Sequence, residues 1–353
     1  MKRFFLALSL FSFLLTGCKE DPSPATPPPV NPTTKGVYVL NEGDFNDPTG
    51  ARLTFYDPET DSVFKNVYES ANGNQSLGNL GDDMLIAGDK LYVTMSGSDE
   101  IKVLDITSNK VLLSKQLPGD DPHDLCYDAK NNRIYVTRLY KNSVLVLNSA
   151  TLAIIDSVSV GPNPLGMILV DSLLFVCNSG YGSGSTVSII NINTLKVSRS
   201  VSVGAGPSSA VIVNGKVFIT CTGNAFAQPA VHGSMYSISA ATKSVVDTLL
   251  FDEVLFGNSA VGKDGNIYVI GSTPGSFFGG PVHKIDPATG VKTKDFIAGT
   301  FYAIAVDQTN GKFYLSDVKN FAADGEVAIH EQNGAFLKKF SAQRGPGTFA
   351  FKR

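Results

Sequence analysis

A short strand pattern ending in Tyr-Val or a close equivalent recurs seven times, and it constrains the fold more than any other feature. The copies read GVYVL, KLYVT, RIYVT, LLFVC, KVFIT, NIYVI and KFYLS. Their anchors are spaced 54, 43, 40, 43, 50 and 46 residues apart and are Tyr38, Tyr92, Tyr135, Phe175, Phe218, Tyr268 and Tyr314. A period of about 40 to 50 residues with four strands per repeat is typical of β-propeller blades. The pattern predicts an all-β, seven-bladed propeller.

Four antiparallel strands per repeat follow from alternating apolar residues between turn signals. In the third repeat we expect them near Asp124–Tyr127, Arg133–Leu139, Ser143–Leu147 and Ala153–Val160. The turn Asn214-Gly215 tolerates the positive φ of a two-residue hairpin, so it favours close pairing of the first two strands. The turns between third and fourth strands are equally short. We therefore expect one face of the propeller to have only short turns and the opposite face to carry the long loops.

The two ends of the repeat region are expected to share one blade. Nothing that resembles an innermost strand precedes Gly36, so the first repeat begins with a second strand. The last segment, Gly345–Phe351, matches the innermost strands that follow Gly161-Pro162 and Gly206-Pro207. We therefore predict that the C-terminal strand completes the first blade and closes the ring.

Residues 1–17 are predicted to be a lipoprotein signal peptide. Two basic residues precede an apolar run, Phe4–Leu15, that is too short for a permanent membrane span. The run ends in LTGC, which resembles a bacterial lipobox and implies that Cys18 is lipidated and becomes the mature N-terminus. The alternative is an ordinary secreted protein with a cysteine at its cleavage point. With the lipid, the protein touches a membrane only through its anchor.

Residues 18–35 are interpreted as the lipidated cysteine and a Pro-rich linker, which leaves 36–353 as the propeller domain. Six prolines between Pro22 and Pro32 favour an extended, semi-rigid spacer. The charged run KED after the cysteine resembles the surface-export signal of Bacteroidetes-type lipoproteins, and a merely solvated linker is the alternative. We expect a protein anchored to the outer membrane and facing the cell exterior.

Charge and cysteine usage restrict the partners. Without residues 1–17 the chain has 27 Lys and Arg against 32 Asp and Glu, a net charge of −5. This mildly acidic composition without basic clusters argues against nucleic acid as a ligand. Cys126, Cys177 and Cys221 have neither CxxC spacing nor a clear pairing pattern, so buried free thiols are expected, although one bridge is compatible with the sequence.

Two groups of residues carry a family resemblance. The repeated Lys/Arg-Ile/Val-Tyr-Val-Thr strand resembles that of YVTN-type β-propellers. The opening segments Gly36–Gly43 (GVYVLNEG) and Leu53–Pro58 (LTFYDP) resemble lipid-anchored propellers of Bacteroidetes-type cell surfaces. That group includes surface cobalamin-binding proteins that work beside TonB-dependent transporters. The resemblance covers the whole mature domain and implies the fold and a surface location more specifically than it implies a ligand.

The long connections of the loop-rich face are rich in aromatic residues. Loops of ten or more residues in an otherwise economical repeat are usually functional or disordered. The candidate contact residues for a ligand are Phe45, Tyr140, Tyr181, Phe226, Phe278 and Phe321. Rings around a shared axis offer contact area at low entropic cost. The alternative for each ring is that it packs under its own loop or against the adjoining blade.

His123 is the candidate polar residue on this face. It occupies the step after proline at which sister repeats have Leu165 and Ser208. An imidazole there can contact an anion or coordinate the metal of a bound cofactor-like ligand, and a solvent-exposed turn histidine is the alternative. His283 and His330 fall in third strands and are interpreted as blade-surface residues.

No motif indicates catalysis. The chain has four histidines, no tryptophan, no G-x-S-x-G elbow and no zinc or phosphate-binding spacing. The pairs Asp82-Asp83 and Asp120-Asp121 can attract a hard cation, but calcium-loop spacing is lacking. We therefore predict a non-enzyme without a metal site or resident cofactor.

Two functional hypotheses follow. The first is a surface lipoprotein whose loop-rich face captures a bulky nutrient and passes it to an outer-membrane, TonB-dependent transporter. The family resemblance favours a cobalamin-like corrinoid as that nutrient. The second is a protein-interaction scaffold that uses the same face and needs no small ligand.

Overall fold

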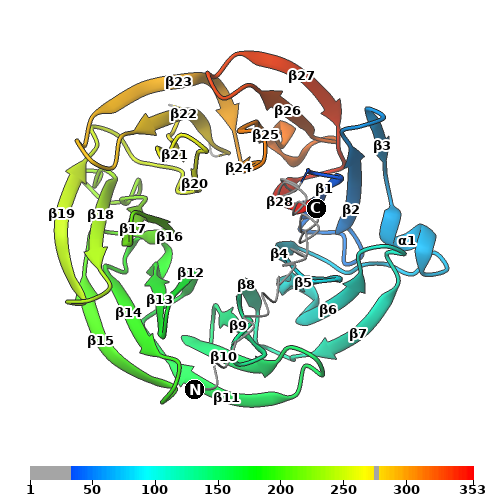
Figure 1. The fold of residues 1–353 in the computed structure, drawn as a ribbon, viewed down its shortest axis with the longest axis horizontal. Coiled ribbons are helices and arrows are strands. Elements are labelled where there is room, and N and C mark those ends of the chain that lie inside the picture. The colour runs from blue at the N-terminus through cyan, green and yellow to red at the C-terminus, as the bar shows by residue number, and fades with distance from the viewer. Residues whose placement is uncertain (1–32, 274–277) are drawn as a thin grey trace, which may run out of the picture. The chain divides into compact units, whose positions relative to one another are not determined.

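The computed structural model describes residues 33–273 and 278–353, which form seven four-stranded antiparallel sheets around a central channel (Figure 1). This confirms the predicted all-β, seven-bladed propeller. The signal peptide, Cys18 and most of the linker lie outside the described residues. Within each blade the four strands follow one another from the channel outward, so one edge strand of the sheet is innermost and the other forms the outer rim.

The first four blades are built from β28 and β1 to β15, named in order from the channel outward. Blades 1 and 2 contain β28 (Pro346–Lys352), β1 (Gly36–Asn41), β2 (Arg52–Asp57) and β3 (Ser62–Phe64), then β4 (Gly81–Ala87), β5 (Lys90–Met95), β6 (Glu100–Asp105) and β7 (Val111–Gln116). Blades 3 and 4 contain β8 (Pro122–Asp128), β9 (Arg133–Arg138), β10 (Ser143–Asn148) and β11 (Ile154–Ser159), then β12 (Pro164–Val170), β13 (Leu173–Asn178), β14 (Thr186–Asn191) and β15 (Lys196–Ser202).

Blades 5 and 6 contain β16 (Pro207–Val213), β17 (Lys216–Cys221), β18 (Ser234–Ser239) and β19 (Ser244–Leu250), then β20 (Ser259–Val261), β21 (Ile267–Ile270), β22 (Gly280–Ile285) and β23 (Lys292–Phe301). Blade 7 contains β24 (Ile304–Val306), β25 (Phe313–Asp317), β26 (Glu326–His330) and β27 (Phe336–Ser341). The helices are α1 (Val67–Ala71), η1 (Ser96–Ser98), η2 (Gly180–Gly182) and η3 (Lys319–Phe321). None of the helices in the described part of the chain has the length and apolar character needed to span a membrane.

The short turns on one face follow from residues that accept a left-handed backbone. Asn214 has φ 49° and Gly215 has φ 74°, as a two-residue hairpin of this kind requires. The tight turn pairs β16 with β17 from Val213–Lys216 onward. The long connections from the second to the third strand of a blade, and from the fourth strand to the next blade, are thereby left on the opposite face, which we call the loop-rich face.

The C-terminal strand closes the ring as predicted. β28 pairs antiparallel with β1, with Ala350 opposite Tyr38 and Lys352 opposite Gly36. The innermost strand of every blade packs against the innermost strands of its two neighbours, and β28 packs against β4 and β24 in this way. Closure removes the open sheet edges that a linear array would leave.

The anchor residues of the repeat are core residues that join neighbouring blades. Tyr38 and Tyr135 are at most 1% exposed, and every anchor lies in one of seven apolar clusters between blades. The Tyr38 hydroxyl donates to the carbonyl of Ile106 in blade 2 at 2.9 Å. Tyr92 donates in the same way to Ser149 in blade 3 at 2.8 Å. The repeated motif therefore holds the ring together and contributes nothing to a surface site.

Candidate functional site

Equivalent residues of the innermost strands surround the mouth of the channel on the loop-rich face. Pairing in blades 2 to 5 is interrupted by a register shift at the start of the innermost strand. The residues that follow the first paired position are Asp82, His123, Leu165 and Ser208. Each of these residues lies three positions before the residue that pairs with the anchor of its blade. By the same count, the equivalent residue is Tyr302 in blade 7 and Gly347 in blade 1. The predicted equivalence of His123, Leu165 and Ser208 is thus confirmed, and Asp82 joins them.

Blade 1 has glycine, Gly347, at this mouth position, and the side chain of Glu42 fills the space instead. Glu42 follows β1, and a Cβ built on Gly347 would lie 2.4 Å from Glu42 Oε1. Glycine at position 347 therefore leaves the space that the Glu42 carboxyl group occupies. That carboxyl group is hydrogen-bonded to the Tyr302 hydroxyl and is close enough to Asp82 for electrostatic repulsion.

The carboxyl groups at the mouth are acids with raised pKa values. Burial, with a smaller contribution from Asp82, raises the pKa of Glu42 to about 8, although the hydrogen bond from Tyr302 opposes the shift. Burial also raises the pKa of Asp82, against the effect of His123, whose Nε2 lies 3.4 Å from Asp82 Oδ1. Burial and then Asp82 raise the pKa of Asp121. All three groups are half-buried.

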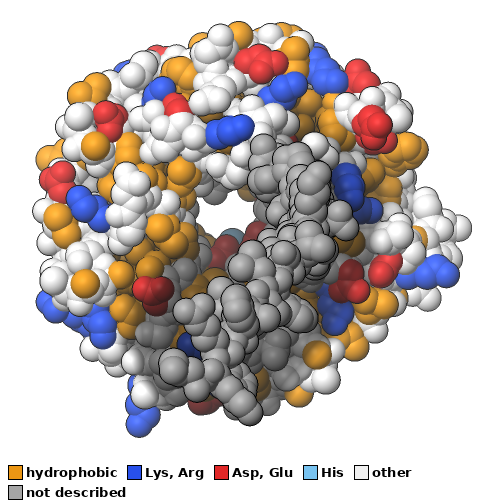
Figure 2. Space-filling view, in the orientation of Figure 1, with side chains coloured by type: hydrophobic (Ala, Val, Ile, Leu, Met, Phe, Trp, Pro, Cys, Tyr) orange, Lys and Arg blue, Asp and Glu red, His pale blue; other side chains and the backbone are white. Residues whose placement is uncertain are grey.

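The arginines nearest to this region are already paired. Arg138 Nη1 lies 3.1 Å from Asp120 Oδ2, and Arg344 contacts Asp44. His123 is the basic group that acts on both Asp82 and Asp121. Figure 2 shows acidic and histidine side chains deep within the central opening. The mouth therefore has an excess of acidic groups.

Asp83 and Asp124, one position deeper, connect neighbouring blades. Asp83 Oδ2 accepts the backbone N–H of Leu125 at 2.9 Å, and Asp124 Oδ2 accepts that of Met167 at 2.7 Å. Burial raises the pKa of Asp83 to about 6, and burial followed by the Asp83 charge raises the pKa of Asp124 well above its usual value. The carboxyl groups of Asp83 and Asp124 are hydrogen-bonded to each other, which also raises the pKa of Asp124. Their backbone contacts give both a structural role.

A cavity of about 710 Å³ adjoins the mouth over blades 4 to 6. Its wall includes Leu165, Ser208, Tyr181, Phe226, Phe256 and Thr222. Leu165 and Ser208 are also mouth residues, so the cavity and the channel mouth share a boundary. The Phe226 ring is 84% exposed, and its backbone N–H donates to Asn224 Oδ1 at 2.9 Å, which fixes the loop that carries it.

Tyr140 and Tyr181 form a bridge between blades 3 and 4. Their hydroxyl groups are 2.9 Å apart and their ring centroids 6.4 Å apart. Tyr181 has φ 51°, an uncommon backbone conformation for an aromatic residue. Burial and the Tyr140 hydroxyl, followed by Asp121 and Asp82, raise the pKa of Tyr181. Tyr181 therefore lines the cavity with one part of its side chain and approaches the acidic mouth with another.

A second aromatic row runs along blades 6 and 7. Centroid distances are 5.2 Å for Phe256 to Tyr302, 5.5 Å for Tyr302 to Phe321 and 5.4 Å for Phe321 to Phe278. Phe278 and Phe321 thus pack against other rings and support Tyr302 at the mouth. This is the packing alternative that the sequence left open for each loop aromatic.

The predicted site residues do not form one cluster. Tyr181 and Phe226 share the cavity, Tyr140 joins them through Tyr181, and His123 lies at the mouth. Phe45 is 80% exposed in the connection that follows β1 and does not line this cavity.

Sequence reasoning missed three mouth residues. Glu42 and Tyr302 were not selected, and Asp82 was considered only as half of an acidic pair. Aligning each innermost strand backward from its anchor would have placed Asp82 and Tyr302 beside His123. Glu42 offers no such signal, because it belongs to a loop and reaches the mouth through the space above Gly347.

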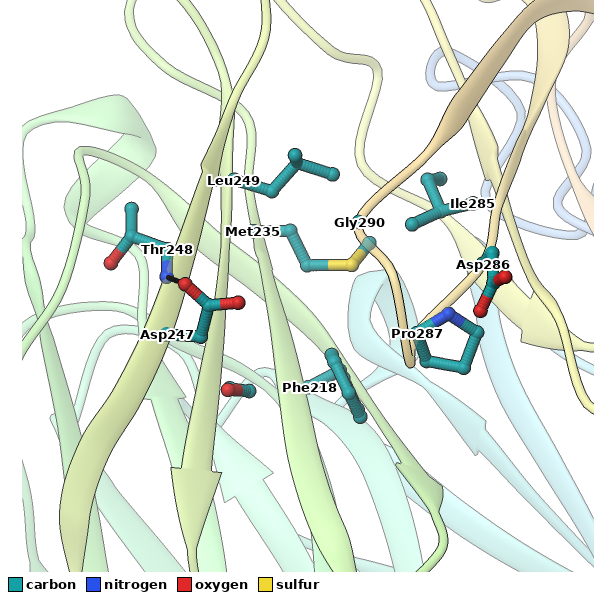
Figure 3. Close-up of a pocket in the computed structure, with 10 residues that line it drawn as sticks. Phe218, Met235, Asp247, Thr248, Leu249, Ile285, Asp286, Pro287 and Gly290 are labelled. Carbon is teal, nitrogen blue, oxygen red and sulfur yellow. Dashed lines mark hydrogen bonds between the residues drawn. The ribbon is translucent and has the colours of Figure 1, made fainter.

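The remaining observations concern a small pocket, metal ligands and the cysteines. The pocket in Figure 3 lies between blades 5 and 6, where Met235 and Phe218 face the turn at Pro287, and its volume of about 20 Å³ admits little more than a water molecule. Within residues 33–273 and 278–353, no group of three or more His, Cys, Asp or Glu is arranged to hold a metal ion. The three cysteines of this part of the chain are free thiols, and Cys177 and Cys221 are buried.

Solved structures similar to this one are propellers with unrelated names. A provisionally named 6-phosphogluconolactonase from Bacteroides fragilis has a TM-score of 0.67 at 12% identity, over 91% of this chain and 98% of that one. Hydrazine synthase of Kuenenia stuttgartiensis has a TM-score of 0.62 at 16% identity, over 74% and 86%. Virginiamycin B lyase from Staphylococcus aureus has a TM-score of 0.57 at 12% identity, over 74% and 83%. At these identities the likeness shows the fold alone.

Sequence comparison is more specific. No curated protein matches the chain. Residues 35–212, just over half of the chain, match a family model described as a domain of unknown function, DUF5074. The chain therefore belongs to the DUF5074 family.

Proposed function

We propose that the loop-rich face binds a bulky small-molecule nutrient, with the cavity of about 710 Å³ as the main contact. The observation that carries this proposal is that the cavity and the acidic channel mouth share a boundary at Leu165 and Ser208. Ligand pockets of about 300 to 1,000 Å³ with mainly apolar walls and a few polar groups are typical of small-molecule sites.

A cobalamin-like corrinoid remains the favoured nutrient within this proposal. Its flat ring suits the exposed rings of Tyr181 and Phe226, and its peripheral amide groups supply donors for carboxyl groups at the mouth. The lipid anchor at Cys18 and hand-over to an outer-membrane transporter belong to the same proposal and rest on the sequence of the N-terminal segment.

Isothermal titration of the lipid-free domain with cobalamin, haem and a ferric siderophore tests the proposal. We expect one of them to bind and Phe226→Ala to weaken it by about tenfold, because the ring loses buried contact area. Phe336→Ala is the matched control, since Phe336 is 59% exposed on the outer strand β27 and should not affect affinity. Absence of binding to all three compounds would remove the nutrient hypothesis.

Phe45 favours a second function for the same face. It is 80% exposed, lies in blade 1 and does not line the cavity of blades 4 to 6. An exposed aromatic ring of this kind is suited to anchoring a protein partner. If the domain is a protein-interaction scaffold, a pull-down without added ligand should retain a partner that Phe45→Ala loses. The non-enzyme hypothesis stays a prediction, because proteins named as enzymes are among those that share the fold.

A further inference from the structure

We propose that the site recognises a ring-bearing organic cation, with the ring in the cavity and the positive charge at the channel mouth. This inference rests on the proposed binding function of the cavity and adds the charge of the ligand to it.

The first step is that one ligand can contact both regions at once. Leu165 and Ser208 line the cavity and occupy the mouth positions of blades 4 and 5. Tyr181 also lines the cavity, and its hydroxyl group is influenced by Asp121 and Asp82 at the mouth. A ring placed beside Tyr181 therefore has an attached group within reach of those carboxyl groups.

The second step concerns the apolar end. Tyr181 is 59% exposed and Phe226 is 84% exposed, although both rings line a concave surface. They come from adjacent blades, and η2 holds Tyr181 in its left-handed conformation. Rings presented in this way favour a flat apolar group, which they can stack against or contact by their edges.

The third step concerns the charge. Carboxyl groups of Glu42, Asp82 and Asp121 come from three separate segments. Asp82 occupies the mouth position of blade 2, and Asp121 lies two residues before His123, which occupies that of blade 3. Glu42 fills the space above Gly347 in blade 1. Nearby Arg138 and Arg344 are committed to Asp120 and Asp44. The described residues form no set of three metal ligands, so an ammonium or similar organic cation fits better than a bare metal ion. The faces of tyrosine rings add attraction for such a cation.

The mouth should bind the cation more tightly as the pH rises. The groups that face one another there are Glu42, Asp82, Asp121, His123 and Tyr302. Burial holds the pKa of Glu42 at about 8, so this carboxyl group is mostly protonated at pH 6 and mostly ionised at pH 9.

Three fluorescent probes with one ring system separate ring binding from charge recognition. Dansyl-ethylenediamine carries an amine, dansylglycine carries a carboxylate and dansyl amide carries neither. At pH 8.5 we expect the amine to bind at least about tenfold more tightly than the carboxylate. Asp82→Asn should weaken the amine by about tenfold and leave dansyl amide unchanged, whereas Asp156→Asn on the exposed strand β11 should change neither. Affinity for the amine should increase from pH 6 to pH 8, a range over which Glu42 begins to ionise and the ammonium group of the probe stays charged.

The possible failures are distinguishable. Equal affinity for the three probes, with loss on Phe226→Ala, would leave the binding cavity standing and overturn the cation. No binding by any probe would overturn this inference, and the titration with cobalamin, haem and the siderophore would then decide separately whether the proposed function stands. If thermal unfolding shows that Asp82→Asn is not folded, Asp121→Asn provides the same test, because Asp121 lies outside the strand pairing.

Discussion

Glu42 illustrates how a single residue position can depend on a distant one. Its carboxyl group occupies space that exists only because residue 347, at the other end of the chain, is glycine. The same carboxyl group has its pKa raised by burial and by Asp82 of the next blade. The acidic character of the mouth is therefore a property of the closed ring, and no single segment contains it.

The paired acids Asp83 and Asp124 should make stability depend on pH. Because the folded protein raises both pKa values, their contribution to stability is fully present below about pH 4 and is lost as the pH rises through the folded-state pKa values. That value is about 6 for Asp83, and the pKa of Asp124 is well above its usual range. Asp124→Asn keeps an oxygen for the Met167 N–H and removes one charge. We expect this variant to lose about 1 kcal/mol less stability than the wild type between pH 5 and pH 8.

Thermal unfolding at a series of pH values measures this difference. Asp156→Asn, an equal change of charge on an exposed strand, should give a curve parallel to that of the wild type. If Asp124→Asn also gives a parallel curve, the interaction between Asp83 and Asp124 does not contribute to the pH dependence.

At the level of single residues, sequence reasoning found His123, Tyr181 and Phe226 because each lies at a recognisable place in the repeat. It was wrong about His283 and His330, interpreted as surface residues, which are 1% and 6% exposed. His283 Nδ1 accepts the backbone N–H of Asp295 at 3.0 Å, and its Nε2 lies 3.3 Å from Glu253 Oε1. These polar contacts come from other strands and loops, so alternation within the third strand could not indicate them.

Among the elements, η2 has the backbone geometry most closely connected with the site. Gly180, Tyr181 and Gly182 all have positive φ, and Tyr181 is the residue for which this is costly. Loop length identified this connection as important, but the direction of the ring follows from the three left-handed residues, which the sequence pattern does not reveal.

Replacing Tyr181 by glycine separates the two consequences of that geometry. Tyr181→Gly suits the left-handed backbone and removes the bridge to Tyr140 and the cavity wall. We expect the free energy of unfolding to change by no more than about 1 kcal/mol. Binding to the cavity should weaken by about tenfold or more. Calorimetric unfolding and titration with the nutrient or dansyl probes measure the two effects.

Tyr140→Phe is the milder comparison, because it removes the hydroxyl contact and keeps both rings. It should preserve most of the affinity. A large loss of stability in Tyr181→Gly would show instead that the ring supports the fold.

For the whole molecule, the seven-fold pattern, the strand order and the closing strand were predictable, because each blade repeats the same buried strands and short turns. The cavity was not predictable, since it lies between loops of three different blades that share no pattern. Repeats determine where loops emerge, and the individual loop sequences determine what they form.

Deletion of residues 345–353 tests the closure directly. It removes β28, the innermost strand of blade 1, and leaves β1, β4 and β24 without their neighbour. We expect a sharp fall in melting temperature or failure to fold, because β1 then exposes an unpaired edge and apolar area. Addition of a synthetic peptide of residues 345–353 should restore part of the stability, and unchanged unfolding of the truncated chain would contradict the closure.

The antiparallel pairing that places Gly36 opposite Lys352 also has a mechanical consequence. Tension applied to the chain ahead of Thr34 reaches first the hydrogen bonds from Thr34 to Asp307 and from Lys35 to Lys352, and then the pairing of β1 with its neighbours. The strand pairing that closes the ring is therefore also the part of the fold that would carry the load on a tethered propeller.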